Sequence, residues 1–325
     1  MGLIRRFAPG ENFRGVLRFG LRFSPHAAKI VSLSPRNRKQ QTLTGPSRQG
    51  ACGMRSPAHT IDFRALLLKE VKGATRALRG DAPSPEDVHR CRVHLKRARA
   101  LGKVGYMCAP GLSGSFNDIA RNVMHAMSGD RDLVALSETA RAQAKASEKR
   151  SHPKRAAALR TVAEHLETEQ ARSAGPDWRY VRAGLADLAA LANVWPEASV
   201  RQLKRGLKRI TRNARDAFRK GQGAKSAQLR HKWRRREKER LYASDLLKDA
   251  WLNSVPRRHK RNEKLGAALG KERDVLLLLE RIEATTREIG GEKIAKRARR
   301  ALKQRRAEIA RSADALGRKL HRGRG

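Results

Sequence analysis

The chain has few aromatic residues, and this shortage bears on what it binds. Phe, Trp and Tyr make up only 4% of its 325 residues. Proteins that bind single-stranded nucleic acid usually stack the bases on aromatic rings. The charge alone would suit either kind of ligand. The shortage of aromatic rings therefore favours a polyanion without bases over nucleic acid as the ligand.

Cysteine and long apolar segments are scarce as well. The three cysteines, Cys52, Cys91 and Cys108, are odd in number, and none belongs to a C-x-x-C pair. No disulfide framework or zinc motif is visible, which is typical of a protein in a reducing cytosol. The uncharged apolar runs are far shorter than the roughly 20 residues that a membrane-spanning helix needs. The sequence therefore predicts a cytoplasmic protein without a membrane span.

Basic residues far outnumber acidic ones. Lys and Arg total 74 while Asp and Glu total 31, so the net charge is +43 at pH 7 and the pI is near 11.6. A charge of this size indicates a polyanionic partner such as nucleic acid, an anionic membrane or a polyphosphate.

Residues 1–60 differ in composition from the rest of the chain. They hold eleven Lys or Arg residues and a single acid, Glu11, and they are rich in Gly, Pro and Ser. This composition predicts a disordered basic arm. Two alternatives stay open: an organellar transit peptide, or a start codon assigned too early, with Met54 as the true start. Residues 61–325 alone keep a charge of +33, so the basic character extends beyond the arm.

From residue 61 onward the sequence predicts an all-α fold. Ala, Leu, Arg, Lys and Glu dominate, and these are strong helix formers, whereas β-branched runs with period-two alternation are absent. Clusters of Gly, Pro and Ser separate the periodic segments. The predicted helices span residues 61–79, 85–107, 114–127, 131–149, 154–173, 177–194, 198–219, 225–253, 257–269, 272–289 and 292–319.

Two stretches of the chain carry nearly the same pattern. Residues 89–99 and 231–242 both begin His-x-x-Arg-x-x-x-Lys, 142 positions apart, and each is followed at the same spacing by an Arg-Asp pair. These pairs are Arg131-Asp132 and Arg273-Asp274. Such a repeat predicts a duplicated structural unit. We expect halves at about 61–195 and 196–320, each a four-helix bundle, related by a pseudo-twofold axis.

The cations of each copy share one helix face at about 100° per residue. In the first copy Arg92, Lys96 and Arg99 fall on one side of His89. The adjacent arc, which we expect to face the core, carries Val88, Cys91, Leu95 and Ala98. In the second copy His231, Arg234 and Lys238 keep these places, with Arg235 and Tyr242 across the same line and Leu241 in the place of Arg99.

Basic stripes also mark the helix that precedes each copy. One carries Arg201, Lys204, Lys208, Arg212 and Arg215, and the other carries Lys69, Lys72, Arg76 and Arg79. We expect these helices to line a continuous cationic groove, because rigid helices hold Arg forks and Lys charges in register for phosphate oxygens. The predicted phosphate-binding residues are His89, Arg92, Lys96, Arg97, Arg99, His231, Arg234, Arg235, Lys238, Lys204, Lys208, Arg212, Lys72 and Arg76.

These motifs resemble those of the CHAD family, the conserved histidine α-helical domain. The family hallmark, V-H-x-x-R-V-x-x-R-R-x-R followed by L-G-x-x-R-D, is similar to residues 88–99 in the first half and to residues 269–274 in the second. The resemblance covers roughly residues 61–320. It implies two four-helix bundles around a basic central groove or pore, binding of inorganic polyphosphate, and association with polyphosphate granules.

The chain departs from the family pattern at two positions. Ser128 replaces a Gly before Arg131-Asp132, and Leu241 replaces a basic residue, so we expect the second half to contribute less to binding at that end. The E-x-E-x-K motif of the triphosphate-tunnel domain that some family members carry is absent. The catalytic activity of that domain is therefore not expected here.

Metal binding and catalysis are weaker alternatives. His89 and His94 lie about 140° apart on a helix, whereas joint ligation favours i, i+4 spacing, and the neighbouring cations repel a metal ion. Phosphoryl transfer needs positioned carboxylates with metal ions, so Asp132 and Asp274 are better interpreted as helix caps or ion-pair partners. We predict a non-enzymatic protein that uses no metal and no cofactor.

Non-specific nucleic-acid binding is the main alternative function. The charge supports salt-sensitive affinity for DNA or RNA, but no RNP sequence or zinc finger is present. If polyphosphate occupies the groove, reversing the charges of the two motif copies abolishes binding, and deleting residues 1–53 matters little. If the protein is a general nucleic-acid binder, either change lowers its affinity by a similar amount.

Overall fold

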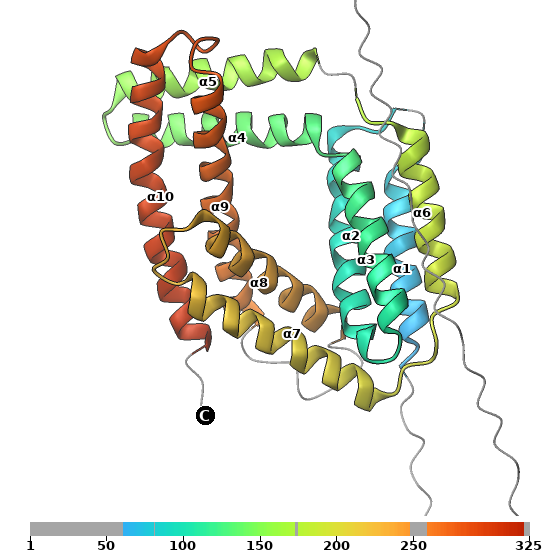
Figure 1. Ribbon diagram of the computed structural model, residues 1–325. Helices are drawn as coiled ribbons and strands as arrows, with labels where there is room; N and C mark the ends of the chain where they lie inside the picture. The colour runs from blue at the N-terminus through green and yellow to red at the C-terminus, as the bar shows by residue number, and fades with distance from the viewer. Residues whose placement is uncertain (1–60, 81, 173–174, 248–258, 322–325) are drawn as a thin grey trace, which may run out of the picture. The chain divides into compact units, whose positions relative to one another are not determined.

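The computed structural model describes residues 61–80, 82–172, 175–247 and 259–321. Every regular element within these ranges is helical, which confirms the predicted all-α fold (Figure 1). The elements are α1 (Phe63–Ala77), α2 (Pro85–Val104), the 3-10 helix η1 (Gly105–Met107), α3 (Pro110–Ala126), α4 (Gly129–Glu148), α5 (Pro153–Ala171), α6 (Trp178–Asn193), α7 (Val200–Gly221), α8 (Ala227–Leu247), α9 (His259–Ala284) and α10 (Glu292–His321). The predicted basic arm at residues 1–60, including Met54, lies outside the described residues.

The helices in these ranges include none with a stretch long and apolar enough to cross a membrane.

Capping side chains set the starts of the two helices that precede or carry the motif. The Ser84 side chain accepts a hydrogen bond from the Asp87 backbone N–H, the Asp87 carboxylate accepts one from Ser84, and Pro85 opens α2. Ser199 and Gln202 form the same reciprocal pair at the start of α7. These local signals are why the starts expected at residues 85 and 198 agree with the structure to within about two residues.

One predicted helix boundary is wrong. The helices expected at 257–269 and 272–289 form the single helix α9. Gly270 lies inside it, and a glycine within a helix costs only about 1 kcal/mol, which the burial of Leu269, Val275 and Leu278 outweighs. Asp274 is therefore in the middle of a helix, so its interpretation as a helix cap is wrong, and the alternative of an ion-pair partner stays a prediction.

Among the residues that the structure describes, three groups of buried apolar side chains join the helices. The first unites α1, α2, α3 and α6 with parts of α7 and α8 around Trp195, whose ring centre lies 5.8 Å from that of Phe63. The second joins α4 and α5 to α9 and α10 (Figure 1). The third joins α7, α8, α9 and α10 around Trp233. Because α4 and α5 share a core with helices of the second half, the predicted division into one bundle per half is not confirmed.

The core-facing edge expected on α2 is confirmed. Val88, Cys91, Leu95 and Ala98 are all buried. Burial raises the pKa of the Cys91 thiol to about 12, although the charge of Arg92 opposes the shift. This thiol is therefore protonated at neutral pH and serves as a packing group.

Helix α7 meets the end of α2 at backbone distance. A Cβ atom on Gly206 would lie 2.1 Å from the carbonyl oxygen of Val104, so only glycine fits there. Next to it the Arg209 guanidinium donates to the Lys103 carbonyl oxygen at 2.7 Å and lies 4.1 Å from the centre of the Tyr106 ring. These contacts hold α7 beside the helix that carries the first copy of the motif.

Candidate anion-binding site

The two helices that carry the motif, α2 and α8, lie against each other. Arg97 on α2 pairs with Asp245 on α8 at 3.3 Å, and Lys103 on α2 pairs with Glu239 on α8. Because the residue number rises along α2 while it falls along α8, the two helices run antiparallel. Both copies of the motif therefore contribute to one region of the protein.

Arg99 of the first copy lies among other cations. Burial lowers the pKa of its guanidinium, the charge of Glu239 opposes this shift, and the charges of Arg121 on α3 and Arg235 on α8 add to it. Its Nε is buried and has no hydrogen-bond partner among the described residues. A buried N–H of a charged group normally has an acceptor, so Arg99 presents an unfilled donor.

Arg234 of the second copy presents the same feature. Its Nε is also buried without a partner in the described part of the chain. Burial lowers the pKa of the neighbouring Lys238 ammonium, and the charge of Arg234 lowers it further. The Lys238 Nζ lies 5.8 Å from the centre of the Tyr242 ring, and the charges of Arg234 and Arg97 both act on the Tyr242 phenol.

His231 begins the second copy and faces α9. Burial lowers the pKa of its imidazole, and the charges of Arg273, Arg234 and Arg235 lower it further. Arg273 belongs to the second Arg-Asp pair, which the sequence places at a repeated spacing from the motif His. The His of the motif and the Arg of the pair act on each other electrostatically across two helices.

The cations at this junction form one set, which we call the interface cluster. It draws on both copies of the motif and on two further helices, and its members are Arg99, Arg121, Arg234, Arg235, Lys238, His231 and Arg273. Burial and the charges of neighbouring cations lower the pKa values of Arg99, Lys238 and His231, and two buried Nε donors have no partner among the described residues, so the arrangement favours a bound anion. An anion would supply the missing acceptors and relieve the mutual repulsion.

Two cluster members were not among the predicted binding residues. Arg121 lies on α3, where no repeat or stripe marks it, and its position depends on how α3 packs on α2. Arg273 belongs to the repeated Arg-Asp pair, and its spacing from His231 was a usable signal. It was not predicted as a binding residue because the pair was interpreted as the start of a helix.

Arg92 is tied into the protein's own backbone. Its Nη1 donates to the carbonyl oxygens of Met124 and Met127 at 2.9 Å each, and its Nη2 lies 3.8 Å from Asp132. The guanidinium thus caps the end of α3 and pairs with the first turn of α4. Its predicted contact with phosphate stays a prediction beside this structural role.

The other predicted residues of the first copy differ in exposure. Lys96 is exposed, His89 is half-buried, and Arg97 is half-buried with its Nε 3.1 Å from the buried Glu70 carboxylate. His94 does not share a ligand set with His89, because its Nδ1 lies 2.8 Å from Glu70 in the contact between α1 and α2. Within the described ranges, no three His, Cys, Asp or Glu residues are placed to hold a metal ion.

The basic stripes lie on other surfaces. Lys72 and Arg76 line a hollow between α1 and α6. Lys204 and Lys208 line a shallow hollow of about 440 Å³ on α7 alone, and Arg212 is exposed further along the same helix. The continuous groove that would join these stripes to the interface cluster stays a prediction.

A buried ionic network holds α8 in place beside the cluster. Arg230, directly before His231, donates to both oxygens of Glu272 on α9 at 2.6 Å and to Asp314 on α10 at 2.6 Å. About two turns further on, the buried Glu237 accepts from Trp233 at 3.0 Å and from Arg240 at 2.8 Å. These contacts fix the orientation of the helix that carries Arg234 and Lys238.

Comparison with solved structures shows that this fold is shared. The chain is similar to PptA from Streptomyces chartreusis, with a TM-score of 0.57 and 17% identity, over 79% of this chain and 98% of that one. It is also similar to the CHAD domain from the plant Ricinus communis, with a TM-score of 0.53 and 18% identity, over 85% of this chain and 98% of that one. At such identities the likeness concerns the fold alone.

No curated protein matches the chain. The family model of the CHAD domain matches residues 64–283, which is more than half of the sequence and includes both copies of the motif. The chain therefore belongs to the CHAD domain family.

Proposed function

We propose that the interface cluster binds inorganic polyphosphate and that the protein acts by binding and not as an enzyme. The observation that carries this proposal is the pair of buried, unfilled Nε donors of Arg99 and Arg234, one from each copy of the motif. A phosphate chain offers acceptor oxygens at every unit and matches the planar donor fork of Arg. One such chain can reach donors on both helices at once.

The spread of the cations supports an extended anion over a single phosphate. The cluster takes its members from α2, α3, α8 and α9, and its charges add to one another across these helices. A small ion would satisfy only the donors nearest to it. A chain with a negative charge at each phosphate neutralises several cations along its length.

The rings near the cluster support a phosphate chain over nucleic acid. The Tyr242 ring faces the Lys238 ammonium, and the Tyr106 ring is covered by the Arg209 guanidinium. A cation over one face of each ring leaves less ring surface for base stacking, on which single-stranded nucleic-acid binding depends, although Tyr106 is 43% exposed. Non-specific nucleic-acid binding, driven by charge alone, stays the alternative.

The carboxylates near the cluster support a binding role. Glu239 is paired with Lys103 and Arg236, and Asp132 lies 3.8 Å from Arg92. Carboxylates engaged in this way are poorly placed to hold the metal ions on which phosphoryl transfer relies. Membership of the CHAD domain family, together with the charge of +43, is why we also propose association with polyphosphate granules in the cytoplasm.

The test compares two double variants of the full chain that lose the same charge. Arg99→Gln with Arg234→Gln removes the two unfilled donors. Arg141→Gln with Arg160→Gln removes two exposed arginines of α4 and α5 that pair with Glu167 and Glu148. Titration with long-chain polyphosphate at physiological salt is expected to show a loss of about a hundredfold for the first variant, since each charged hydrogen bond contributes about 1.5 kcal/mol or more. The second variant should stay close to the wild type, and equal losses would contradict the proposal.

A further inference from the structure

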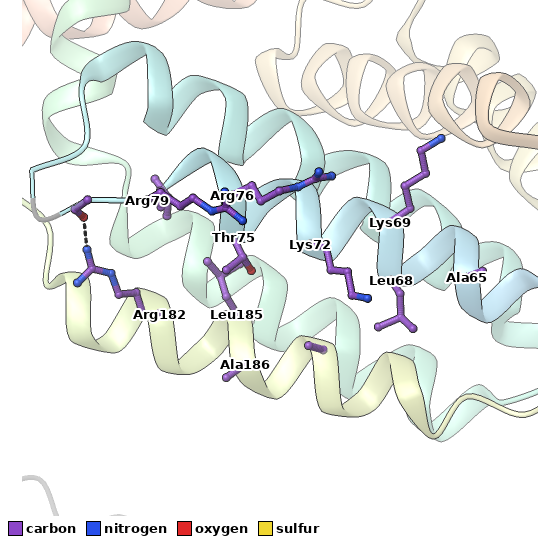
Figure 2. A pocket seen from close by; sticks show the side chains of 13 residues that line it. Ala65, Leu68, Lys69, Lys72, Thr75, Arg76, Arg79, Arg182, Leu185 and Ala186 are labelled. Carbon is purple, nitrogen blue, oxygen red and sulfur yellow. Dashed lines mark hydrogen bonds between the residues drawn. The ribbon is translucent and has the colours of Figure 1, made fainter.

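A hollow of about 1000 Å³ lies between α1 and α6 (Figure 2), and its described lining includes no member of the interface cluster. Its floor is apolar and is built from Leu68 on α1, from Leu78 directly after that helix, and from Leu185, Ala186 and Ala189 on α6. Figure 2 shows Leu68 and Lys72 extending from α1 toward α6, so the apolar floor and a cation face the same space.

Cations surround this floor. Of the described residues that line the hollow, five are basic and none is acidic. Three of them, Lys69, Lys72 and Arg76, lie along α1 at intervals of three or four residues, which is one helical turn, and Arg79 follows just beyond the end of the helix. The fifth, Arg182 on α6, donates to the Gly80 carbonyl oxygen at the end of the hollow (Figure 2).

An apolar floor with a basic border is a poor match for a bare phosphate chain. Phosphate oxygens gain nothing from apolar surface, and removing water from that surface is favourable only if the occupant is itself apolar there. The hollow therefore favours an occupant that has an apolar stripe and acidic groups beside it.

The regular spacing favours a helix over a lipid. A lipid offers one head group to a compact set of cations, whereas here the cations recur at each turn along α1 from Lys69 to Arg76, and Arg79 follows just after the helix. Ala65, Ala186 and Ala189 are small side chains in the lining, so the backbone of an added helix can approach α1 and α6 closely. An acidic amphipathic helix would place apolar residues on the floor and carboxylates against the cations.

We propose that the hollow between α1 and α6 is a docking site for an acidic amphipathic helix of a partner protein. The basic composition of residues 1–60, with one acid, makes that segment of the chain a poor occupant. The described lining of this site shares no residue with the interface cluster, so a polyanion and a partner protein need not compete for the same side chains.

The probe for this proposal is a synthetic helical peptide of about 16 residues with Leu at helical spacing and Glu on both sides of the Leu stripe. A peptide of the same composition in scrambled order is its control. Binding to the full chain is measured by fluorescence anisotropy. Ala186→Glu places a carboxylate on the floor, and Ala142→Glu makes the same change at an exposed position of α4. Thermal melting monitored by circular dichroism checks that both variants are folded.

The patterned peptide is expected to bind at least about tenfold more tightly than the scrambled one and to lose about tenfold in affinity for Ala186→Glu but not for Ala142→Glu. Lys72→Glu with Arg76→Glu should also weaken binding of the patterned peptide, because it replaces two cations of the lining by carboxylates. Equal binding of the two peptides would overturn the proposal. So would displacement of the peptide by long-chain polyphosphate or by vesicles of anionic phospholipid, which would assign the hollow to one of those ligands.

Discussion

Arg230 of α8 and Glu272 of α9 are joined in the protein interior by two hydrogen bonds of 2.6 Å each, and both side chains are only 6% exposed. Arg230 directly precedes His231, so this pair sets the position of the second motif copy relative to α9. Asp314 of α10 accepts from the same guanidinium at 2.6 Å, so three helices depend on one buried cation.

Breaking this pair should strongly destabilise the fold. Glu272→Gln leaves the buried Arg230 with an incomplete set of charged partners, and we expect a loss of about 3 kcal/mol in the free energy of unfolding. The control is Glu280→Gln on the same helix, whose carboxylate is 52% exposed and lies 3.7 Å from Arg273. That change should cost less than about 1 kcal/mol. Urea unfolding followed by tryptophan fluorescence checks both, and equal losses would contradict the structural role of the buried pair.

The glycines of α7 and α9 should respond in opposite ways to alanine. At Gly206 the new Cβ would clash with the Val104 carbonyl group. Because this group belongs to the backbone of a helix end and cannot rotate away as a side chain can, we expect a destabilisation of about 2 kcal/mol. At Gly270 nothing lies within 4 Å, so Gly270→Ala should stabilise the protein by up to about 1 kcal/mol through helix propensity. Thermal unfolding of both variants provides the measurement. A stable Gly206→Ala protein would show that α7 and α2 do not approach so closely.

Arg92→Ala should lower stability because the carbonyl oxygens of Met124 and Met127 lose their donor. The expected loss is about 2 kcal/mol. Arg90→Ala is a suitable control, since the Arg90 side chain is 59% exposed and, among the described residues, forms an ion pair with Asp87 of its own helix. Chemical unfolding distinguishes the two. Unchanged stability of Arg92→Ala would instead support Arg92 as a residue kept for phosphate.

Polyphosphate affinity should rise as the pH falls. Burial and the charges of Arg273, Arg234 and Arg235 hold the pKa of His231 below its ordinary 6.5, and a bound anion would raise it again by favouring the imidazolium. Binding therefore takes up a proton, so acidification below about pH 6.5 strengthens binding of polyphosphate.

The lowered pKa of His231 has the opposite effect on the stability of the free protein. The unfolded state binds the proton more readily than the folded state, so stability decreases as the pH falls through 6.5.

Titrations of the full chain with polyphosphate at several pH values between about 5 and 8 measure this effect. His231→Gln should flatten the dependence of affinity on pH and remove part of the loss of stability in acid. His165→Gln on α5 is the matched control and should leave both unchanged. A pH dependence that is the same in His231→Gln and in the wild type would exclude His231 as the titrating group.

Helical periodicity was sufficient to predict the core-facing edge of α2. Val88, Cys91, Leu95 and Ala98 share one arc and are all buried, because the local pattern of apolar residues decides which face of a helix packs. The all-α fold and the family followed from the same local features and from the repeated motif.

Features that depend on long-range contacts could not be predicted. Periodicity treats charged residues as exposed, yet α8 buries Arg230, Glu237 and Glu239, whose partners lie on other helices or on the same face. The joint core of α4 and α5 with α9 and α10 likewise depends on contacts between distant segments. Arg92 illustrates the limit for the site, since its sequence position cannot reveal that its guanidinium donates to carbonyl groups at the end of α3.

The most direct test of the account is a competition between polyanions for the full chain at physiological salt. Labelled long-chain polyphosphate is displaced by unlabelled polyphosphate, double-stranded DNA or single-stranded RNA at equal phosphate charge. The account predicts that polyphosphate competes about a hundredfold better than either nucleic acid, and that Arg99→Gln with Arg234→Gln abolishes this preference. Equal competition by all three would contradict it and would show a protein that binds any polyanion through charge alone.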